Sequence, residues 1–418
     1  MSQLAKSLVS ALPFFPEHRK LRGRRAVNIS LDDLLDEARM LAKVTDADLD
    51  IIFMGYRYGV PFEKFWEKFF GNKKLKPPPQ LDLFRAGFAL VLTRDNTPLP
   101  ALVNECVEAH KSAFGKEVAT LANAFYRQLA RERDELRQVL QKNPEQFLST
   151  ESLNRWSKHP ELVFRSGRQI AQRPPPGISA LDLEKGEFEK LEPSDFFKRS
   201  AAFAVDLGSW LFCQWVDENF LKPKQKIWDM CAAPGGKTIG LLSLLKTKNH
   251  LSDNFILATE LKSSRLERLE QNLKKASAFL NTSVSRTQVD CELLDVRLQA
   301  LKDSEIGRKY LNQKWDLILL DLPCSGSGTW ASRPDLISAP WAQIHSNNLV
   351  ELQKEICATA SHIKRLQPEC TIIISVCSVD PIERSRIRLY LSEFKTKGEF
   401  FSWEKSDILC EGITAFAV

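Results

Sequence analysis

Two cysteines stand just beyond the ends of two predicted strands, where covalent chemistry is possible. Cys324 follows the apolar run 314–321, which ends in Asp321, and Cys377 directly follows the β-branched run 371–376. In an open α/β sheet, ligands bind beyond the carboxyl ends of the strands. We therefore expect both thiols at one edge of the sheet, beside Asp321. A purely structural role is the alternative, but buried cysteines would more naturally lie inside strands or on helices.

A glycine turn between a predicted strand and a predicted helix marks a second candidate site. The strand 227–229 runs into Pro234-Gly235-Gly236, and an amphipathic stretch follows over 238–245. Glycines allow a ligand to approach the backbone, and the first N–H groups of a helix have no partner within it. An ordinary strand–helix loop is the alternative, because neither GxGxxG nor GxxxxGK[ST] is present. The pattern predicts a cofactor site at this turn.

Two further acids stand where the next predicted strands end. Glu260 ends the run 256–260, and an acid after a glycine turn can accept hydrogen bonds from both hydroxyls of a ribose. A helix-capping role for Glu260 is the alternative. Asp290 ends the run 287–290 and could reach an adenine amino group, although this signal is weak alone.

Methylation of C5 in a pyrimidine requires this combination of groups. That carbon is too electron-poor to attack a methyl donor until a thiolate has added to C6, while an acid supports the charge at N3. The C5 proton must then leave before the thiol is expelled, so two thiols suit the two halves of the reaction. The first thiol must be partly ionised, and Lys237 is the nearest candidate cation.

The composition is that of an ordinary globular protein. The 418 residues are 43% hydrophobic and 27% charged, and the net charge of +6 permits a polyanionic partner without requiring one. No apolar run is long enough to span a membrane, and the N-terminus lacks a signal peptide, so we expect a cytoplasmic protein. The nine cysteines show no CxxC or zinc-like spacing, which indicates free thiols and no metal site.

The periodicity divides the chain into three regions. Residues 1–140 carry only helical patterns, among them 81–92, a helix with Pro100 in its first turn, and 118–129, so an all-α domain is expected. Its aromatic cluster at 62–70 suits a packed core better than a platform for bases. Residues 141–200 are a connector or a small RNA-binding subdomain, and residues 201–418 alternate strand and helix as in a parallel sheet covered on both faces.

Basic and turn-forming segments interrupt these regions. The basic cluster 18–25 is either a solvated arm or a phosphate-contacting one, and Ser30 is a candidate helix cap. A basic, proline-rich break covers 73–79. The connector contains the prolines 174–176 and three arginines that could contact a phosphate backbone: Arg165, Arg168 and Arg173.

Three motifs together resemble the RNA cytosine-C5 methyltransferases of the RsmB and Sun family. They are CAAPGGKT at 231–238, DLPCSGSGTW at 321–330 and SVCSVDPIE at 375–383. A looser resemblance links the helical segments 81–92, 98–111 and 118–129 to the NusB-like domain of the bacterial 16S rRNA enzymes. The resemblance implies a Rossmann-like, class I methyltransferase domain of α/β type over 201–418, preceded by an all-α NusB-like RNA-binding domain over 1–140.

The resemblance also implies a reaction, a cofactor and a partner. The reaction is methylation of cytosine C5 in RNA with S-adenosyl-L-methionine, on 16S ribosomal RNA in preference to tRNA, by a monomer without a metal. Cys377 is the implied nucleophile that adds to C6, Cys324 helps to release the product, and Asp321 holds the base near N3. The implied cofactor residues are Cys231, Ala232, Ala233, Pro234, Gly235, Gly236, Lys237, Glu260, Asp290 and the bordering Asp321.

Several positions depart from the family pattern. Ala331 and Ser332 replace paired arginines, Arg384 and Ser385 replace Asn and Glu, and Val376 replaces Thr before the implied nucleophile. Glu260 stands where Asp is usual, and the connector lacks an Arg-Val-Asn segment. An rRNA-binding assembly factor with weak or lost activity on the same fold is therefore the main alternative. A nicotinamide dehydrogenase is less consistent with the sequence, because GxGxxG is missing.

Overall fold

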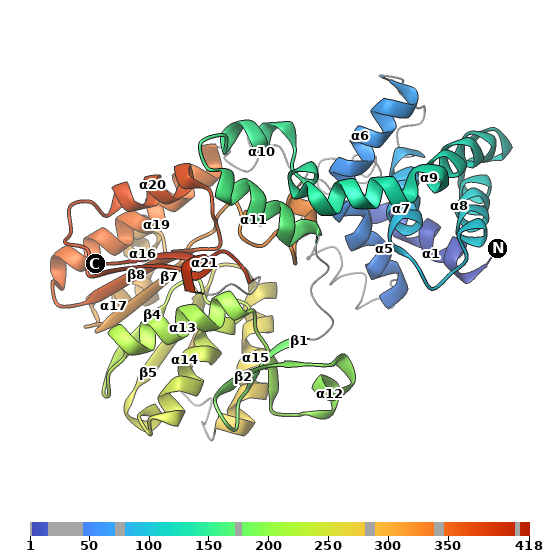
Figure 1. Cartoon of the computed structure of the whole chain (residues 1–418). Helices are drawn as coiled ribbons and strands as arrows, with labels where there is room; N and C mark the ends of the chain where they lie inside the picture. The colour runs from blue at the N-terminus through green and yellow to red at the C-terminus, as the bar shows by residue number, and fades with distance from the viewer. Residues whose placement is uncertain are drawn as a thin grey trace. The chain divides into compact units, whose positions relative to one another are not determined.

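The computed structural model describes residues 2–15, 45–71, 80–171, 178–280, 289–337, 347–405 and 410–418. The chain forms two compact units: unit 1 is Met1–Arg173 with Trp330–Pro340, and unit 2 is Pro174–Thr329 with Trp341–Val418 (Figure 1). The basic cluster 18–25, the predicted cap at Ser30, the break 73–79 and the prolines 174–176 lie outside the described residues.

Unit 1 is helical over the residues that the structure describes, as the sequence predicts for the N-terminal region. The helices are α1 (Gln3–Ala11), η1 (Leu12–Phe14), α5 (Asp46–Arg57), α6 (Gly59–Phe70), α7 (Gln80–Thr93), α8 (Leu99–Phe114), α9 (Lys116–Lys142), η2 (Pro144–Phe147), α10 (Thr150–Arg155), α11 (Pro160–Ala171) and η4 (Pro334–Leu336). The likeness of this unit to NusB stays a prediction.

Local sequence explains where these helices begin and how they pack. Thr45 and Asp48 form a reciprocal capping box at the start of α5, and Pro100 stands in the first turn of α8 as expected. Helix α7 is apolar nearly all round and correspondingly buried. The aromatic residues of α6 pack in the core: Phe62 contacts Phe125 edge-to-face with ring centroids 6.2 Å apart. The cluster is therefore a core, as predicted, and the alternative of a base-binding platform is wrong for its buried rings.

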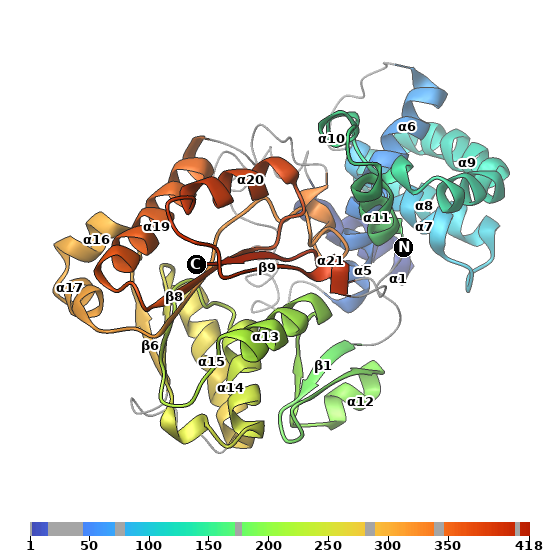
Figure 2. The same ribbon diagram turned by 60° about the vertical axis from the view of Figure 1, so that its left-hand side comes forward.

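Unit 2 is built on a seven-stranded sheet with the order β6-β5-β4-β7-β8-β10-β9. Figure 2 shows helices on both faces of this sheet. The first five strands are parallel, and β10 and β9 join them antiparallel. This confirms the predicted α/β, Rossmann-like fold. The strands are β4 (Lys226–Asp229), β5 (Phe255–Glu260), β6 (Val289–Leu293), β7 (Leu317–Asp321), β8 (Thr371–Val376), β9 (Gly398–Phe401) and β10 (Thr414–Ala417).

Helices cover both faces of this sheet because successive strand residues point to opposite sides. In β4, Ile227 packs in the core shared with α13, α14 and α15, whereas Trp228 packs in the core shared with α16, α17, α19 and α20. Both strand faces are thus apolar, which is the pattern of a buried parallel sheet. The helices are α13 (Leu207–Asn219), α14 (Gly236–Thr247), η3 (Leu251–Asp253), α15 (Ser263–Leu280), α16 (Leu298–Asp303), α17 (Glu305–Asn312), α19 (Asn347–Leu366), α20 (Pro381–Tyr390) and α21 (Ser402–Lys405).

The predicted connector 141–200 contains regular structure that its mixed composition concealed. Its first part forms η2, α10 and α11 of unit 1, and its second part belongs to a small antiparallel sheet of unit 2 with the order β2-β1-β3. The elements of this second part are β1 (Ile178–Asp182), β2 (Glu187–Leu191), α12 (Pro193–Lys198) and β3 (Ala202–Ala204). The domain boundaries at 140 and 200 stay predictions. No helix among the described residues is long and apolar enough to cross a membrane.

Candidate active site

The glycine turn lies between β4 and α14, as the sequence predicts. Gly235 caps α14 with φ of 104°, a left-handed conformation that favours glycine, and a Cβ atom there would lie 2.9 Å from Cδ1 of Leu269. The Gly235 N–H donates to the carbonyl of Ala232 at 2.7 Å, which closes the turn. At Gly236 the backbone is unstrained, and a Cβ would make only ordinary contact, 3.9 Å from Val205. Backbone conformation therefore explains the glycine at position 235 but not the glycine at position 236.

Alanine substitutions should distinguish a conformational role of Gly235 from a ligand-contacting role of Gly236. Gly235→Ala should destabilise unit 2 by about 1–2 kcal/mol, because a Cβ in the left-handed region is strained. Gly236→Ala should leave the melting temperature nearly unchanged but weaken binding of S-adenosylmethionine, since its methyl group enters the cavity beside the turn. Differential scanning calorimetry and isothermal titration calorimetry measure the two effects. Equal cofactor affinity in Gly236→Ala and the parent protein would contradict a ligand at this turn.

A cavity of about 180 Å³ lies against the turn. Three carboxyl groups line it, on Asp206, Asp229 and Asp321, with one cation, Lys237. The remaining lining residues are Ala204, Val205, Ser209, Cys231, Ala232, Ala233, Pro234 and Gly236. An acidic lining suits a cofactor with an ammonium and a sulfonium group, so the residues present fit S-adenosylmethionine. All of the predicted loop residues 231–237 except Gly235 line this cavity.

Lys237 and Asp321 form an ion pair inside the site. Lys237 Nζ lies 2.6 Å from Asp321 Oδ2, and the Ser375 hydroxyl donates to Asp321 Oδ1 at 2.8 Å. Burial alone would lower the pKa of Lys237, but the attraction of Asp321 outweighs it, so the pKa of the ammonium group is raised. The lysine therefore keeps its positive charge and fixes the orientation of the Asp321 carboxyl group.

Two further acids, the buried Asp229 and the partly buried Asp206, belong to the cavity although the sequence did not single them out. Asp229 accepts a hydrogen bond from Thr238 Oγ1 at 2.6 Å, and burial raises the pKa of its carboxyl group to about 6. Asp206 caps α13, accepting from the Gly208 N–H at 2.6 Å, and burial raises the pKa of this group also. The position of Asp229 at a strand end was a usable signal. Asp206 reaches the site only through the packing of α13.

The two predicted thiols meet at the edge of the sheet. Cys324 Sγ lies 3.1 Å from Cys377 Sγ, which confirms their expected proximity. The hydrogen bond with Cys377 and burial raise the pKa of the Cys324 thiol well above its usual value. Cys324 therefore keeps its proton and can donate it toward the sulfur of Cys377. The Gly328 N–H donates to the Cys377 carbonyl at 3.0 Å, which ties the two loops together.

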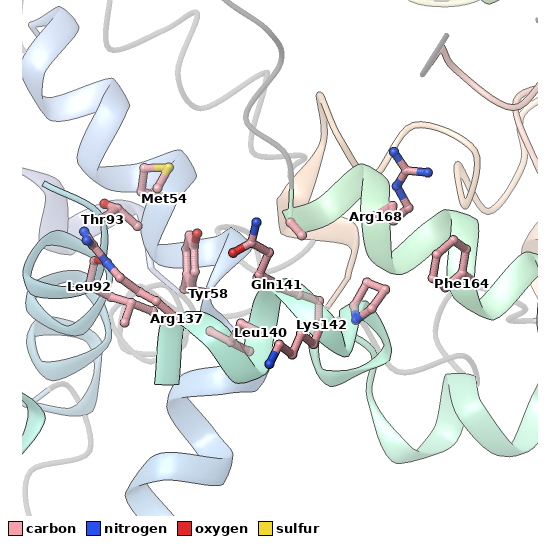
Figure 3. Close-up of a pocket in the computed structure, with 13 residues that line it drawn as sticks. Met54, Tyr58, Leu92, Thr93, Arg137, Leu140, Gln141, Lys142, Phe164 and Arg168 are labelled. Atoms are coloured by element: carbon pink, nitrogen blue, oxygen red, sulfur yellow. The ribbon is translucent and has the colours of Figure 1, made fainter. Parts of the chain in front are cut away.

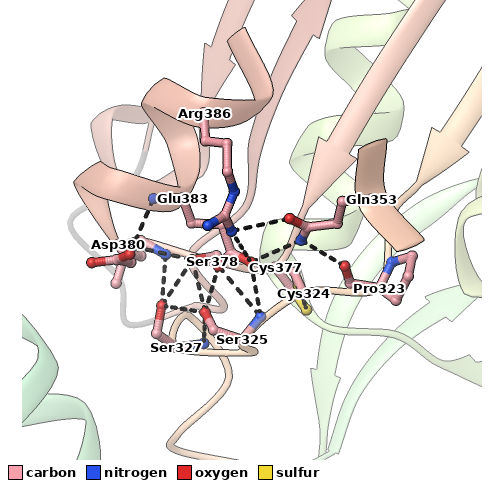
Figure 4. Close-up of polar contacts among 11 residues, drawn as sticks. Pro323, Cys324, Ser325, Ser327, Gln353, Cys377, Ser378, Asp380, Glu383 and Arg386 are labelled. Atoms are coloured by element: carbon pink, nitrogen blue, oxygen red, sulfur yellow. Dashed lines mark hydrogen bonds and ion pairs between the residues drawn. The ribbon is translucent and has the colours of Figure 1, made fainter. Parts of the chain in front are cut away.

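A buried network of polar side chains holds the two cysteine loops (Figure 4). The carboxyl group of Glu383, fully buried on α20, accepts from the Ser325 hydroxyl at 2.6 Å and from the Ser325 N–H at 3.2 Å. Ser378 Oγ lies 3.0 Å from both Ser325 Oγ and Ser327 Oγ. Each cysteine is thus followed directly by a serine of this network. The network fixes the distance between the loops that carry the thiols.

Helix α19 supplies the third side of the network. Gln353 donates through Nε2 to Glu383 Oε1 at 2.9 Å and to the Pro323 carbonyl at 2.8 Å, and its Oε1 accepts from Arg386 at 3.1 Å. Arg386 also lies 3.8 Å from Glu383 Oε1. Sequence reasoning missed Gln353, because it stands in the middle of a helix with no motif around it.

Glu260 occupies the tip of β5 as predicted, but its carboxyl group has local partners. Its Oε1 accepts from the N–H groups of Leu261 and Lys262 at 3.0 and 3.2 Å, and Arg265 lies 3.6 Å from its Oε2. Both N–H groups stand in the turn before α15, which begins at Ser263, so the helix-capping alternative stays a prediction. Glu260 is buried and does not line the 180 Å³ cavity.

Asp290 does not stand at a strand tip, which corrects the sequence prediction. Strand β6 runs from Val289 to Leu293, and Asp290 pairs with Leu257 in the middle of β5. The acid that follows the carboxyl end of β6 is Asp295, whose oxygens accept from the Arg297 side chain at 2.5–3.0 Å. The strand extends further than predicted because its polar residues Cys291 and Glu292 pair regularly with β5.

Comparisons with known proteins find methyltransferases that are similar to part of this chain. Residues 219–405 match the family model described as 16S rRNA methyltransferase RsmB/F. Over 172 residues the chain is 30% identical to the ribosomal RNA small subunit methyltransferase F of Salmonella arizonae, covering 41% of this chain and 31% of the relative. Over 158 residues it is 28% identical to human tRNA (cytosine(72)-C(5))-methyltransferase NSUN6, covering 38% of this chain and 30% of the relative. The aligned part thus spans about three tenths of these relatives.

The fold has a solved counterpart. The crystal structure of PH0851 matches the chain with a TM-score of 0.67 at 16% identity, covering 100% of this chain and 99% of that one. The family match confirms the predicted class of cofactor, S-adenosylmethionine. The three motifs, the fold and the match over 219–405 agree: this part of the chain is similar to the RsmB/F methyltransferase family.

Proposed function

We propose that the protein transfers a methyl group from S-adenosylmethionine to C5 of a cytosine in RNA. The observation that carries the proposal is the pair of thiols, 3.1 Å apart, on the loops that follow β7 and β8, with Asp321 at the end of β7 lining an acidic cavity. A site that needed only to bind a cofactor would have no use for two thiols beside each other. Covalent activation of a pyrimidine uses both.

Each side chain has a step in this mechanism. Cys377 adds to C6 as its thiolate, forming the S–C6 bond and moving the C5=C6 electron pair to C5, while Asp321 supports the charge at N3. The bound cofactor supplies an electrophilic methyl group, to which C5 forms its new bond as the donor's carbon–sulfur pair returns to sulfur. Cys324 then gives its proton to the departing Cys377 sulfur and takes up the proton from C5 in exchange. The freed C–H pair re-forms C5=C6, and the S–C6 pair stays on Cys377, which leaves as a thiol.

The cofactor residues are proposed on the same grounds. The loop 231–237 would hold the donor beside the cavity, where Asp206 and Asp229 would attract its positively charged groups. Glu260 remains the proposed ribose acid, provided that its carboxyl group exchanges a backbone partner for the ligand. For the adenine, Asp295 is better located than the predicted Asp290, because it stands beyond the end of β6.

The proposed substrate is 16S ribosomal RNA, with tRNA as the alternative. The relatives divide in the same way, since one is named for small-subunit rRNA and the other for tRNA. The predicted cytoplasmic location, monomeric state and absence of a metal stay predictions. Bisulfite sequencing of rRNA and tRNA from cells with and without the gene decides between the substrates, because a methylated cytosine resists conversion.

The experiment that tests the mechanism is Cys324→Ala. Addition of Cys377 to C6 should still occur, but release should slow, so a protein–RNA adduct that survives denaturing electrophoresis is expected with S-adenosylmethionine and rRNA fragments. The double variant Cys324→Ala/Cys377→Ala is the control and should give none. An adduct of equal yield in the double variant would contradict Cys377 as the nucleophile.

The main alternative is an rRNA-binding assembly factor on the same fold. The departures at 331–332 and 384–385 motivate it. At one of these positions, the guanidinium carbon of Arg384 lies 4.3 Å from the centroid of the Phe401 ring, so this side chain packs against the protein itself. This alternative predicts cofactor binding without methyl transfer to any rRNA fragment and no adduct in Cys324→Ala. The intact pair of thiols favours the enzyme.

A further inference from the structure

Unit 1 contains a pocket to which neither the motifs nor the comparisons assign a role (Figure 3). Its volume is about 540 Å³, and it is formed by α5, α7, α9, η2 and α11. The lining residues of greatest chemical interest are Tyr58, Arg137, Lys142, Phe147, Phe164 and Arg168.

The pocket is positively charged. Three of its lining residues are cations, Arg137, Lys142 and Arg168, and none of the lining residues is an acid. Arg137 is held in place through Nε, which donates to the Leu92 carbonyl at 2.5 Å, and through its ion pair with Asp95 at 2.8 Å. Lys142 and Arg168 are exposed, and neither makes an ion pair with another residue of the described ranges. An anionic ligand would therefore find two uncommitted cations.

The rim of the pocket also presents a flat aromatic surface. Phe164 is 53% exposed, and Arg168, one helical turn further along α11, lies with its guanidinium carbon 5.8 Å from the ring centroid. A single exposed phenylalanine is ordinary by itself, but beside an arginine it offers a flat face on which a base can stack. Tyr58 and Phe147, edge-to-face at 5.3 Å, form an aromatic part of the wall.

Helix α11 is held firmly enough to present this rim. Its Gly167 approaches η2 so closely that a Cβ there would lie 2.2 Å from the Pro144 carbonyl oxygen. The helix therefore packs backbone to backbone on the pocket wall. Phe164 and Arg168, on either side of this contact in the sequence, are carried by a rigid element.

We propose that this pocket binds a nucleotide of single-stranded RNA. The base stacks on Phe164 and the Arg168 guanidinium, and the phosphate contacts Lys142 and Arg168. Stacking on an aromatic ring together with cationic phosphate contacts is the general physics of single-strand binding. The site does not depend on the proposed methyl transfer, because all of its residues belong to unit 1.

Binding of a fluorescein-labelled octaribonucleotide to the full-length protein, measured by anisotropy, tests the proposal. Phe164→Ala should weaken binding about tenfold, the loss of one stacked base, and Phe164→Trp should retain it. Arg168→Ala should weaken binding and lower the salt slope by about 0.7, the loss of one phosphate contact. The controls are Arg131→Ala, an exposed arginine of α9 outside the pocket, and Leu366→Ala, an exposed leucine of unit 2; both should stay within about twofold.

Photocrosslinking locates the ligand independently. An octamer containing 4-thiouridine should crosslink to α11 in the parent protein and not in Phe164→Ala. Unchanged affinity and crosslinking in Phe164→Ala would overturn the proposal, as would equally tight binding of free AMP or of a polyglutamate peptide at the pocket. Cys377→Ala should bind the octamer like the parent protein, so failure of the methyl-transfer mechanism would leave this result standing.

Discussion

Cys377→Ala is expected to lower the rate of methyl transfer to RNA by at least about a thousandfold. Without the sulfur, no thiolate adds to C6, and C5 of the cytosine stays too electron-poor to accept the methyl group. Incorporation of a tritiated methyl group into rRNA fragments measures the rate, and mass spectrometry of the digested RNA identifies 5-methylcytosine. Of all single substitutions, the removal of this sulfur atom should lower the rate of methyl transfer most.

The control for this variant is another thiol of the same unit. Cys357 is buried on α19 in the core and lies outside both cysteine loops. Cys357→Ala should keep at least half of the parent rate. Cofactor titration shows whether Cys377→Ala is still folded at the site, since it should bind S-adenosylmethionine with the parent affinity. Methylation by Cys377→Ala at the parent rate would eliminate the covalent mechanism.

The sheet edge of the proposed active site is predictable from sequence because its strands are buried on both faces. Such strands are continuous apolar runs, so β8 and the following loop could be located from 371–376 alone, and α19 from its helical periodicity. A residue directly after such a run must lie at the carboxyl edge. Cys324, Cys377 and Asp321 were located on this basis.

Features that depend on tertiary contacts could not be predicted in this way. Strands β9 and β10 have four residues each and lack the length of a clear signal, and β2 carries three charged residues and buries only Leu191. The end of β6 was misplaced because Cys291 and Glu292 do not resemble a buried strand. Gln353 lies at the site only because α19 packs against the cysteine loops. Asp206 lies there only because the start of α13 packs beside the cavity.

Glu383→Gln is expected to destabilise unit 2 by about 2–4 kcal/mol, because it removes the acceptor around which the two cysteine loops are arranged. The buried carboxyl group accepts from Ser325 and Gln353, which are also buried, and lies beside the partly buried Arg386. A glutamine would direct an N–H₂ group toward one of these donors and leave the Arg386 charge without its partner, a loss typical of broken buried networks. The melting temperature of unit 2 should fall by several degrees.

The matched control is Glu399→Gln. Glu399 is 2.8 Å from Arg388, but both side chains are exposed, and such surface pairs contribute at most about 1 kcal/mol. Calorimetry should therefore separate the two variants clearly. If Glu383→Gln melts like Glu399→Gln, the network does not hold the loops. If it melts lower but transfers methyl groups at the parent rate at 10 °C, the network stabilises the fold without setting the distance between Cys324 and Cys377.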